Sequence, residues 1–74
     1  MKWLKIQHVG GVDFLNLEQV YRVRPSGTTD VIFYDANSIL PVSYSFATQQ
    51  EQIEFIAKFE SITQALELDK LAAQ

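Results

Sequence analysis

A chain of 74 residues has room for one hydrophobic core, and its 47% hydrophobic and 20% charged fractions are near the averages of folded domains. Six basic and nine acidic residues give a net charge of −3, which argues against strong non-specific binding to nucleic acid. The sequence contains no cysteine, which excludes disulfides and thiolate metal sites and fits a reducing compartment. We therefore expect residues 1–74 to form a single small domain.

The charges are unevenly distributed along the chain. Residues 1–27 carry four basic and two acidic side chains, whereas residues 28–74 carry two basic and seven acidic ones. Such an asymmetry marks either a partner surface or the solvated face of an acidic helix, and we favour the second interpretation. No apolar run is long enough for a signal peptide or a membrane-spanning helix, so we expect a cytoplasmic protein without membrane contact.

The first turn signal is Gly10-Gly11, since glycine tolerates the positive φ angles of a two-residue hairpin loop. Pairing outward from this turn sets Ile6 opposite Leu15 on an apolar face and leaves a mixed face on the other side. The same register sets His8 opposite Asp13. The sequence therefore predicts a half-buried antiparallel hairpin.

A bend is predicted over residues 16–19, capped by the Asn16 side chain. The reason is that Leu17, Val20 and Val23 recur at every third residue, which strand alternation cannot place on one face. A new strand is expected from about Val20 to Arg24.

Two further strands are predicted at residues 31–34 and 39–46, which are rich in β-branched and aromatic residues. If Ala36-Asn37 is a two-residue loop, Phe33 faces Leu40 and Val31 faces Val42 in the last hairpin. This register keeps the serines of the last strand out of the core.

A C-terminal helix is predicted from about residue 48 to residue 66. Thr48 and Glu51 have the spacing of a capping box, in which each side chain satisfies a free backbone N–H. One apolar stripe follows, formed by Phe55, Phe59, Ile62 and Leu66. We expect an α+β domain in which an antiparallel β-meander of four to five strands has one face covered by this amphipathic helix. The tail from about residue 68 is expected to be frayed or to contact a neighbour.

Few residues of the sequence are candidates for catalysis or for metal binding. His8 and Asp13 are predicted to pair, and such a pair can orient an imidazole as a general base. No nucleophile on a sharp turn accompanies them, so we favour a structural or an exposed histidine. The helix carboxylates spread around its surface without histidine or cysteine, which makes a poor metal site. We expect no catalytic site, no metal site and no cofactor, and hence no enzyme.

The predicted registers leave aromatic, apolar and basic side chains on the sheet face away from the helix, and two leucines lie off the helix stripe. Together they form the candidate interaction surface: Trp3, Lys5, Phe14, Arg22, Arg24, Ile32, Tyr34, Ile39, Leu68 and Leu71. Tryptophan, tyrosine and arginine are enriched at protein interfaces. Aromatic and basic side chains together also stack bases and hold phosphates, as in proteins that bind single strands. A third interpretation is a second core, covered by the tail or by sheet curvature.

The order of elements from residue 1 to about residue 59 resembles the short bacterial proteins of the FlbD type, which are linked to flagella and swarming motility. The matching segments are Gly10-Gly11, residues 16–20 and residues 31–34. The chain lacks the Asn-Pro-Asp usual at the bend and the glycine usual in the later hairpin. The resemblance implies the topology and is not extended to motility. A ββββα fold of the coactivator type, which binds single strands, is similar in outline.

The sequence therefore predicts a non-enzymatic interaction or regulatory module that forms a homodimer or binds a protein partner. Two-fold pairing is the commonest way to bury an exposed apolar patch, because one patch then serves both partners. The alternative is a protein that binds single-stranded nucleic acid through the outer sheet face.

Overall fold

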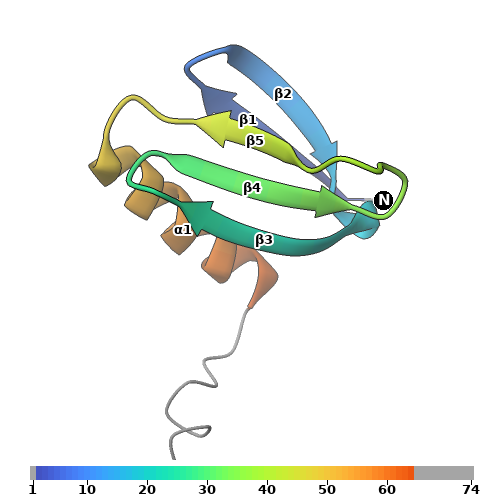
Figure 1. Ribbon diagram of the computed structural model, residues 1–74. Helices are drawn as coiled ribbons and strands as arrows, with labels where there is room; N and C mark the ends of the chain where they lie inside the picture. Colours follow the sequence, from blue (N-terminus) through green and yellow to red (C-terminus); the bar gives the residue numbers. More distant parts are fainter. Residues whose placement is uncertain (1, 65–74) are drawn as a thin grey trace, which may run out of the picture.

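Five antiparallel strands and one C-terminal helix make up the described part of the computed structural model, residues 2–64 (Figure 1). In chain order the elements are β1 (Trp3–His8), β2 (Gly11–Asn16), the 3-10 helix η1 (Leu17–Gln19), β3 (Val20–Ser26), β4 (Asp30–Asp35), β5 (Val42–Ser45) and α1 (Gln49–Thr63). The predicted α+β class is confirmed, and so is the antiparallel meander order. The 15-residue α1 is the single α-helix of this part of the chain and falls short of what a membrane span requires.

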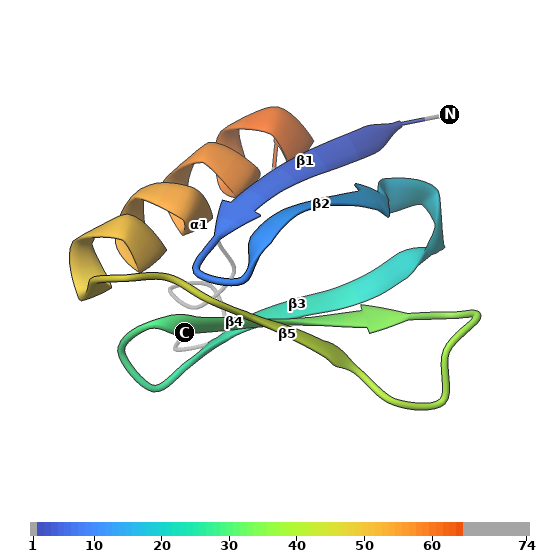
Figure 2. The ribbon, with the colours of Figure 1, turned by 90° about the horizontal axis from the view of Figure 1, so that it is seen from above.

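The meander is divided into two sheets, a hairpin of β1 and β2 and a three-stranded sheet in the order β3-β4-β5. The division occurs at η1, where the Asn16 side chain accepts the N–H of Glu18 at 3.0 Å, so the predicted cap forms. Because η1 redirects the chain, β3 leaves the hairpin and pairs with β4. Figure 2 shows the hairpin lying over the three-stranded sheet.

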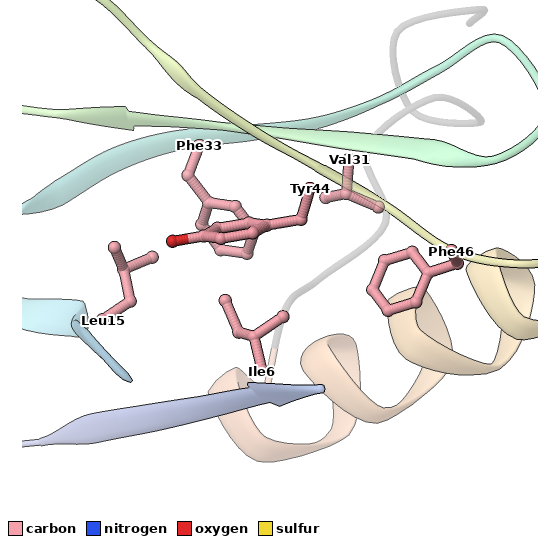
Figure 3. Close-up of a cluster of buried hydrophobic side chains, with 6 residues drawn as sticks. All are labelled: Ile6, Leu15, Val31, Phe33, Tyr44 and Phe46. Carbon is pink, nitrogen blue, oxygen red and sulfur yellow. The ribbon is translucent and has the colours of Figure 1, made fainter. Parts of the chain in front are cut away.

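The hydrophobic core lies between the two sheets and is closed along one side by α1 (Figure 3). Ile6 and Leu15 of the hairpin face Phe33 of the sheet, and all three are buried. The Phe33 ring meets the rings of Phe55 and Phe59 edge-on, each at a centroid distance of 6.0 Å. The helix thus packs through its aromatic residues into the opening between the sheets.

Local contacts at its first turns fix the start of α1. Thr48 is the N-cap, and its hydroxyl accepts the N–H of Glu51 at 3.2 Å, as the capping box predicts. Gln52 is buried, and its side-chain amide donates to the carbonyls of Asp30 at 2.8 Å and Gly27 at 3.4 Å. These two bonds tie the helix to the turn between β3 and β4.

The far end of α1 falls short of the predicted boundary. The helix ends at Thr63, and Gln64 adopts a left-handed conformation with φ of 55°. Ile62, the last described member of the predicted stripe, is 52% exposed rather than covered. Leu66, Leu68 and Leu71 lie outside the described residues.

The predicted register of the first hairpin is wrong by two residues. Leu15 pairs with Leu4, while Ile6 pairs with Asp13. The cause is the turn, which is formed by Val9 and Gly10, so that the second glycine already belongs to β2 with φ of 128°. Since side chains alternate with a period of two, the slip leaves Ile6 and Leu15 on the buried face.

The predicted register of the last hairpin is also wrong by two residues, because Phe33 pairs with Val42 and Val31 with Tyr44. The connection is a long loop over residues 36–41 rather than a two-residue turn. Asp35 holds this loop by accepting the N–H of Asn37 at 2.7 Å. β5 therefore starts only after Pro41, whose nitrogen has no hydrogen to donate.

Candidate functional site

The structure divides the predicted surface residues between two opposite sides of the molecule, because the two sheets turn their inner faces toward the same core (Figure 2). The outward positions of the hairpin form the hairpin face: Trp3, Lys5, Gln7, Val12, Phe14 and Asn16. The other side is the sheet face: Tyr21, Arg22, Arg24, Ile32 and Tyr34. Ile39 belongs to neither, since it lies in the loop over residues 36–41 and is 99% exposed.

Large apolar side chains gather on the hairpin face. Trp3 is 58% exposed, Val12 51% and Phe14 63%. Lys5 stands opposite Phe14 in the register, so one cation lies among these apolar groups. The hairpin therefore has apolar side chains on both of its faces. One face packs in the core, and the other face is exposed to solvent.

The sheet face combines aromatic and basic groups. The Arg22 guanidinium carbon lies 5.0 Å from the centre of the Tyr34 ring, which is a cation–π contact. The Tyr21 ring lies 6.1 Å from that of Tyr34 and is the more exposed, at 69% for the residue. Sequence reasoning missed Tyr21, because a register shift between Val20 and Arg22 takes it out of strict alternation.

The predicted pair of His8 and Asp13 forms, although the two residues are diagonal neighbours rather than opposite one another. The Nε2 of His8 lies 2.6 Å from Oδ2 of Asp13. The backbone N–H of Gly10 donates to Nδ1 at 3.1 Å, so Nδ1 is the acceptor and Nε2 carries the proton. Both nitrogens are engaged in holding the turn, and neither is free to take a proton from a substrate.

Tyr44 packs beneath this pair and connects it to the core. Its ring centre lies 4.7 Å from that of His8 and 5.6 Å from that of Phe33, and only 7% of the residue is exposed. Burial raises the pKa of the Tyr44 phenol above its ordinary value of 10.0, and the charge of Asp13 adds to the increase. The phenol is therefore kept neutral at the junction of the two sheets.

A groove runs between β1 and α1, with a volume of about 410 Å³. Its apolar lining comes from Leu4, Phe46, Phe55, Phe59 and Ile62. Its polar lining comes from Lys5, Gln7, Glu51, Glu54 and Lys58. Sequence reasoning missed this site, since it depends on how far the helix stands from the hairpin. One sequence feature could have indicated the groove: the apolar stripe of the helix, with Phe55, Phe59 and Ile62, is bordered by the charged residues Glu54 and Lys58.

Within residues 2–64, no three histidine, cysteine or carboxylate side chains lie close enough together to bind one metal ion.

Comparisons with protein-family models, with curated proteins and with solved structures found no match. The resemblance to FlbD-type proteins accordingly stays a prediction.

Proposed function

We propose that the protein is a non-enzymatic interaction or regulatory module that self-associates through the hairpin face. The observation that supports this most is the exposure of Trp3, Val12 and Phe14, each more than half accessible on one side of one hairpin. Monomers seldom leave a contiguous apolar patch in solvent. The absence of cysteine fits action in the cytoplasm.

A second copy of the chain is the occupant that suits this face. A two-fold axis lets one patch serve both partners, and an aromatic pair such as Trp3 and Phe14 supplies large rigid surfaces for the contact. Lys5 can extend its methylene groups over an aromatic ring of the other copy while its charge remains near the rim.

The test is the mass in solution, measured by light scattering after gel filtration over a roughly hundredfold concentration range. We expect the mass to rise from 8.5 kDa toward about twice that value. Phe14→Ser should keep the chain monomeric. Ile39→Ser is the matched control, because Ile39 is fully exposed but lies in a loop away from the hairpin, and this variant should associate like the wild type. A constant monomer mass in the wild type contradicts the proposal.

The sheet face supports a second candidate function, the binding of single-stranded nucleic acid. The supporting observation is the placement of Arg22 over Tyr34 with Tyr21 alongside. Arg22 already covers one face of the Tyr34 ring, which weakens this alternative. We expect a labelled single strand not to bind near physiological salt. Micromolar binding that is lost in Arg22→Glu and kept in Lys58→Glu, a charge reversal on α1, would favour nucleic acid instead.

A further inference from the structure

One edge of the hairpin has backbone groups directed into the groove beside α1. The N–H of Leu17 donates to the Lys2 carbonyl at 3.0 Å, which identifies a hydrogen-bonded pair of the β1–β2 ladder. Such pairs alternate along an antiparallel ladder, so the N–H and carbonyl groups of Lys5 and Gln7 point away from β2. The N–H of Val9 follows this alternation and donates to β5 at 2.9 Å. Along the rest of that edge, no strand within residues 2–64 pairs with β1.

An unpaired strand edge selects another strand, because its donors and acceptors repeat with the spacing of an extended backbone. Lys5 and Gln7, whose backbone groups point outward, also line the groove. The apolar floor beneath them includes Phe46, Phe55 and Phe59. An extended segment placed there would bond to β1 through its backbone, and the alternate side chains on one of its faces would contact α1.

The helix side of the groove carries an ordered set of three side chains. Glu54, Lys58 and Ile62 lie four residues apart in α1 and all line the groove. Four residues of α-helix advance about 6 Å, and two residues of a strand advance about 6.6 Å. Alternate side chains of a bound strand would therefore meet an acid, a base and an apolar group in turn.

These charged groups are not neutralised by one another. Within residues 2–64, no ion pair is formed by Lys58 or by Glu54, whose carboxylate only accepts a 3.3 Å bond from the Gln50 amide. Their charges are thus available to a partner of complementary sequence.

The direction of the partner follows from the arrangement of the elements. Figure 2 shows β1 and α1 running side by side in opposite directions. A strand antiparallel to β1, which is the slightly more stable pairing, runs parallel to α1. It meets Glu54 first, Lys58 second and Ile62 last.

We propose that the groove binds an extended segment of another protein as a third strand on β1. The segment carries a basic, an acidic and an apolar residue at alternate positions, as in Lys-x-Glu-x-Leu. The groove shares Lys5 and Gln7 with the border of the hairpin face, but its apolar lining and its helix side lie outside that face. The inference does not rest on self-association through the hairpin face.

The test uses the full chain and two fluorescein-labelled peptides, Thr-Lys-Thr-Glu-Thr-Leu-Thr and a control with its Lys and Glu exchanged. Fluorescence anisotropy should show saturable binding of the first peptide and binding of the control that is weaker by about tenfold. The double variant Glu54→Lys/Lys58→Glu should reverse this preference. Glu60→Lys, on α1 but not lining the groove, should leave it unchanged.

Strand addition itself is tested by a peptide that is N-methylated at the residues whose backbone N–H groups would bond to β1. This peptide keeps every side chain and loses those backbone donors. Undiminished binding of this peptide would overturn the proposal. So would an unchanged preference in the double variant, or no saturable binding up to about 1 mM peptide. The Phe14→Ser monomer should bind the peptide like the wild type, which separates this result from the test of self-association. Peptide binding that weakens as the protein concentration rises, in the wild type and in Phe14→Ser alike, would assign the groove to a second copy of the chain and overturn the proposal of another protein as partner.

Discussion

Gln52 is the buried polar side chain of the core among residues 2–64, with 5% of its surface exposed. Its amide satisfies the carbonyls of Asp30 and Gly27 and thereby links α1 to the β3–β4 turn. No pattern in the sequence indicates this role, since a glutamine directly after a capping box is compatible with full exposure. Only the packing of the helix against the turn determines which residue of the first turns is buried.

We expect Gln52→Met, which keeps the volume and removes the donor, to lower the free energy of unfolding by about 1–2 kcal/mol. The loss comes from the partly buried carbonyls that lose their partner. Gln50→Met is the matched control, because Gln50 is exposed and its side chain, among the described residues, bonds only to Glu54 at 3.3 Å. This variant should change stability by less than about 0.5 kcal/mol. Urea melts measure both. Equal effects would show that the bonds to the turn contribute nothing.

At the scale of elements, the predicted helix caps were correct, whereas the predicted positions of the hairpin turns were not. The caps formed by Asn16 and Thr48 depend on residues two and three positions away, and both are present. The registers of the first and last hairpins were wrong by two residues, a shift that keeps the side chains of the paired strands on their predicted faces. Ile39 and Leu40 are the exceptions, because both lie in the loop before β5. Hydrophobic alternation cannot detect such a shift, so only the loop conformation decides it. The separation into two sheets depends on the direction in which the chain leaves η1, which no local pattern encodes.

The first hairpin offers a test of how its loop sets the register. Gly11 has φ of 128°, whereas Gly27 has φ of 58°. Asparagine enters the left-handed region near 58° at small cost, but a φ of 128° is accessible essentially to glycine alone. Gly11→Asn should therefore lower the free energy of unfolding by about 1–3 kcal/mol, while Gly27→Asn should cost less than about 1 kcal/mol.

Thermal or urea melts of the two glycine variants decide this. Each substitution adds a side chain into open space, since no atom lies within 4 Å of a Cβ built at either glycine. The difference therefore reports backbone conformation rather than a clash. Equal stabilities would mean that the hairpin turn can change its conformation, and with it the register of β1 and β2.

At the scale of the whole molecule, the division of the strands into two sheets changes which surfaces are candidates for function. The hairpin face and the sheet face are directed to opposite sides, so a partner bound at one leaves the other open (Figure 2). The groove adjoins the hairpin face, because Lys5 and Gln7 belong to both. The sequence could supply most members of the first two surfaces. It could not show that they are separate, because a single continuous sheet fits the same alternation.

The junction of the two sheets holds a group whose ionisation is linked to folding. Tyr44 lies there, buried between His8 and Phe33, and burial raises the pKa of its phenol above 10.0. In the unfolded chain the phenol ionises near its ordinary value, so above that pH the unfolded state binds fewer protons than the folded state. The contribution of the neutral phenol is fully present below pH 10.0 and is lost as the pH rises through the folded pKa.

We therefore expect the free energy of unfolding, measured by urea melts from about pH 8 to about pH 12, to fall more steeply above pH 10.0 in the wild type than in Tyr44→Phe. Phenylalanine keeps the ring in the core and removes the ionisable group. Tyr21 and Tyr34 are present in both proteins, so their titration cancels in the difference between the two curves. Parallel curves over the whole range would show that the Tyr44 phenol ionises at the same pH whether or not the hairpin is packed on the sheet.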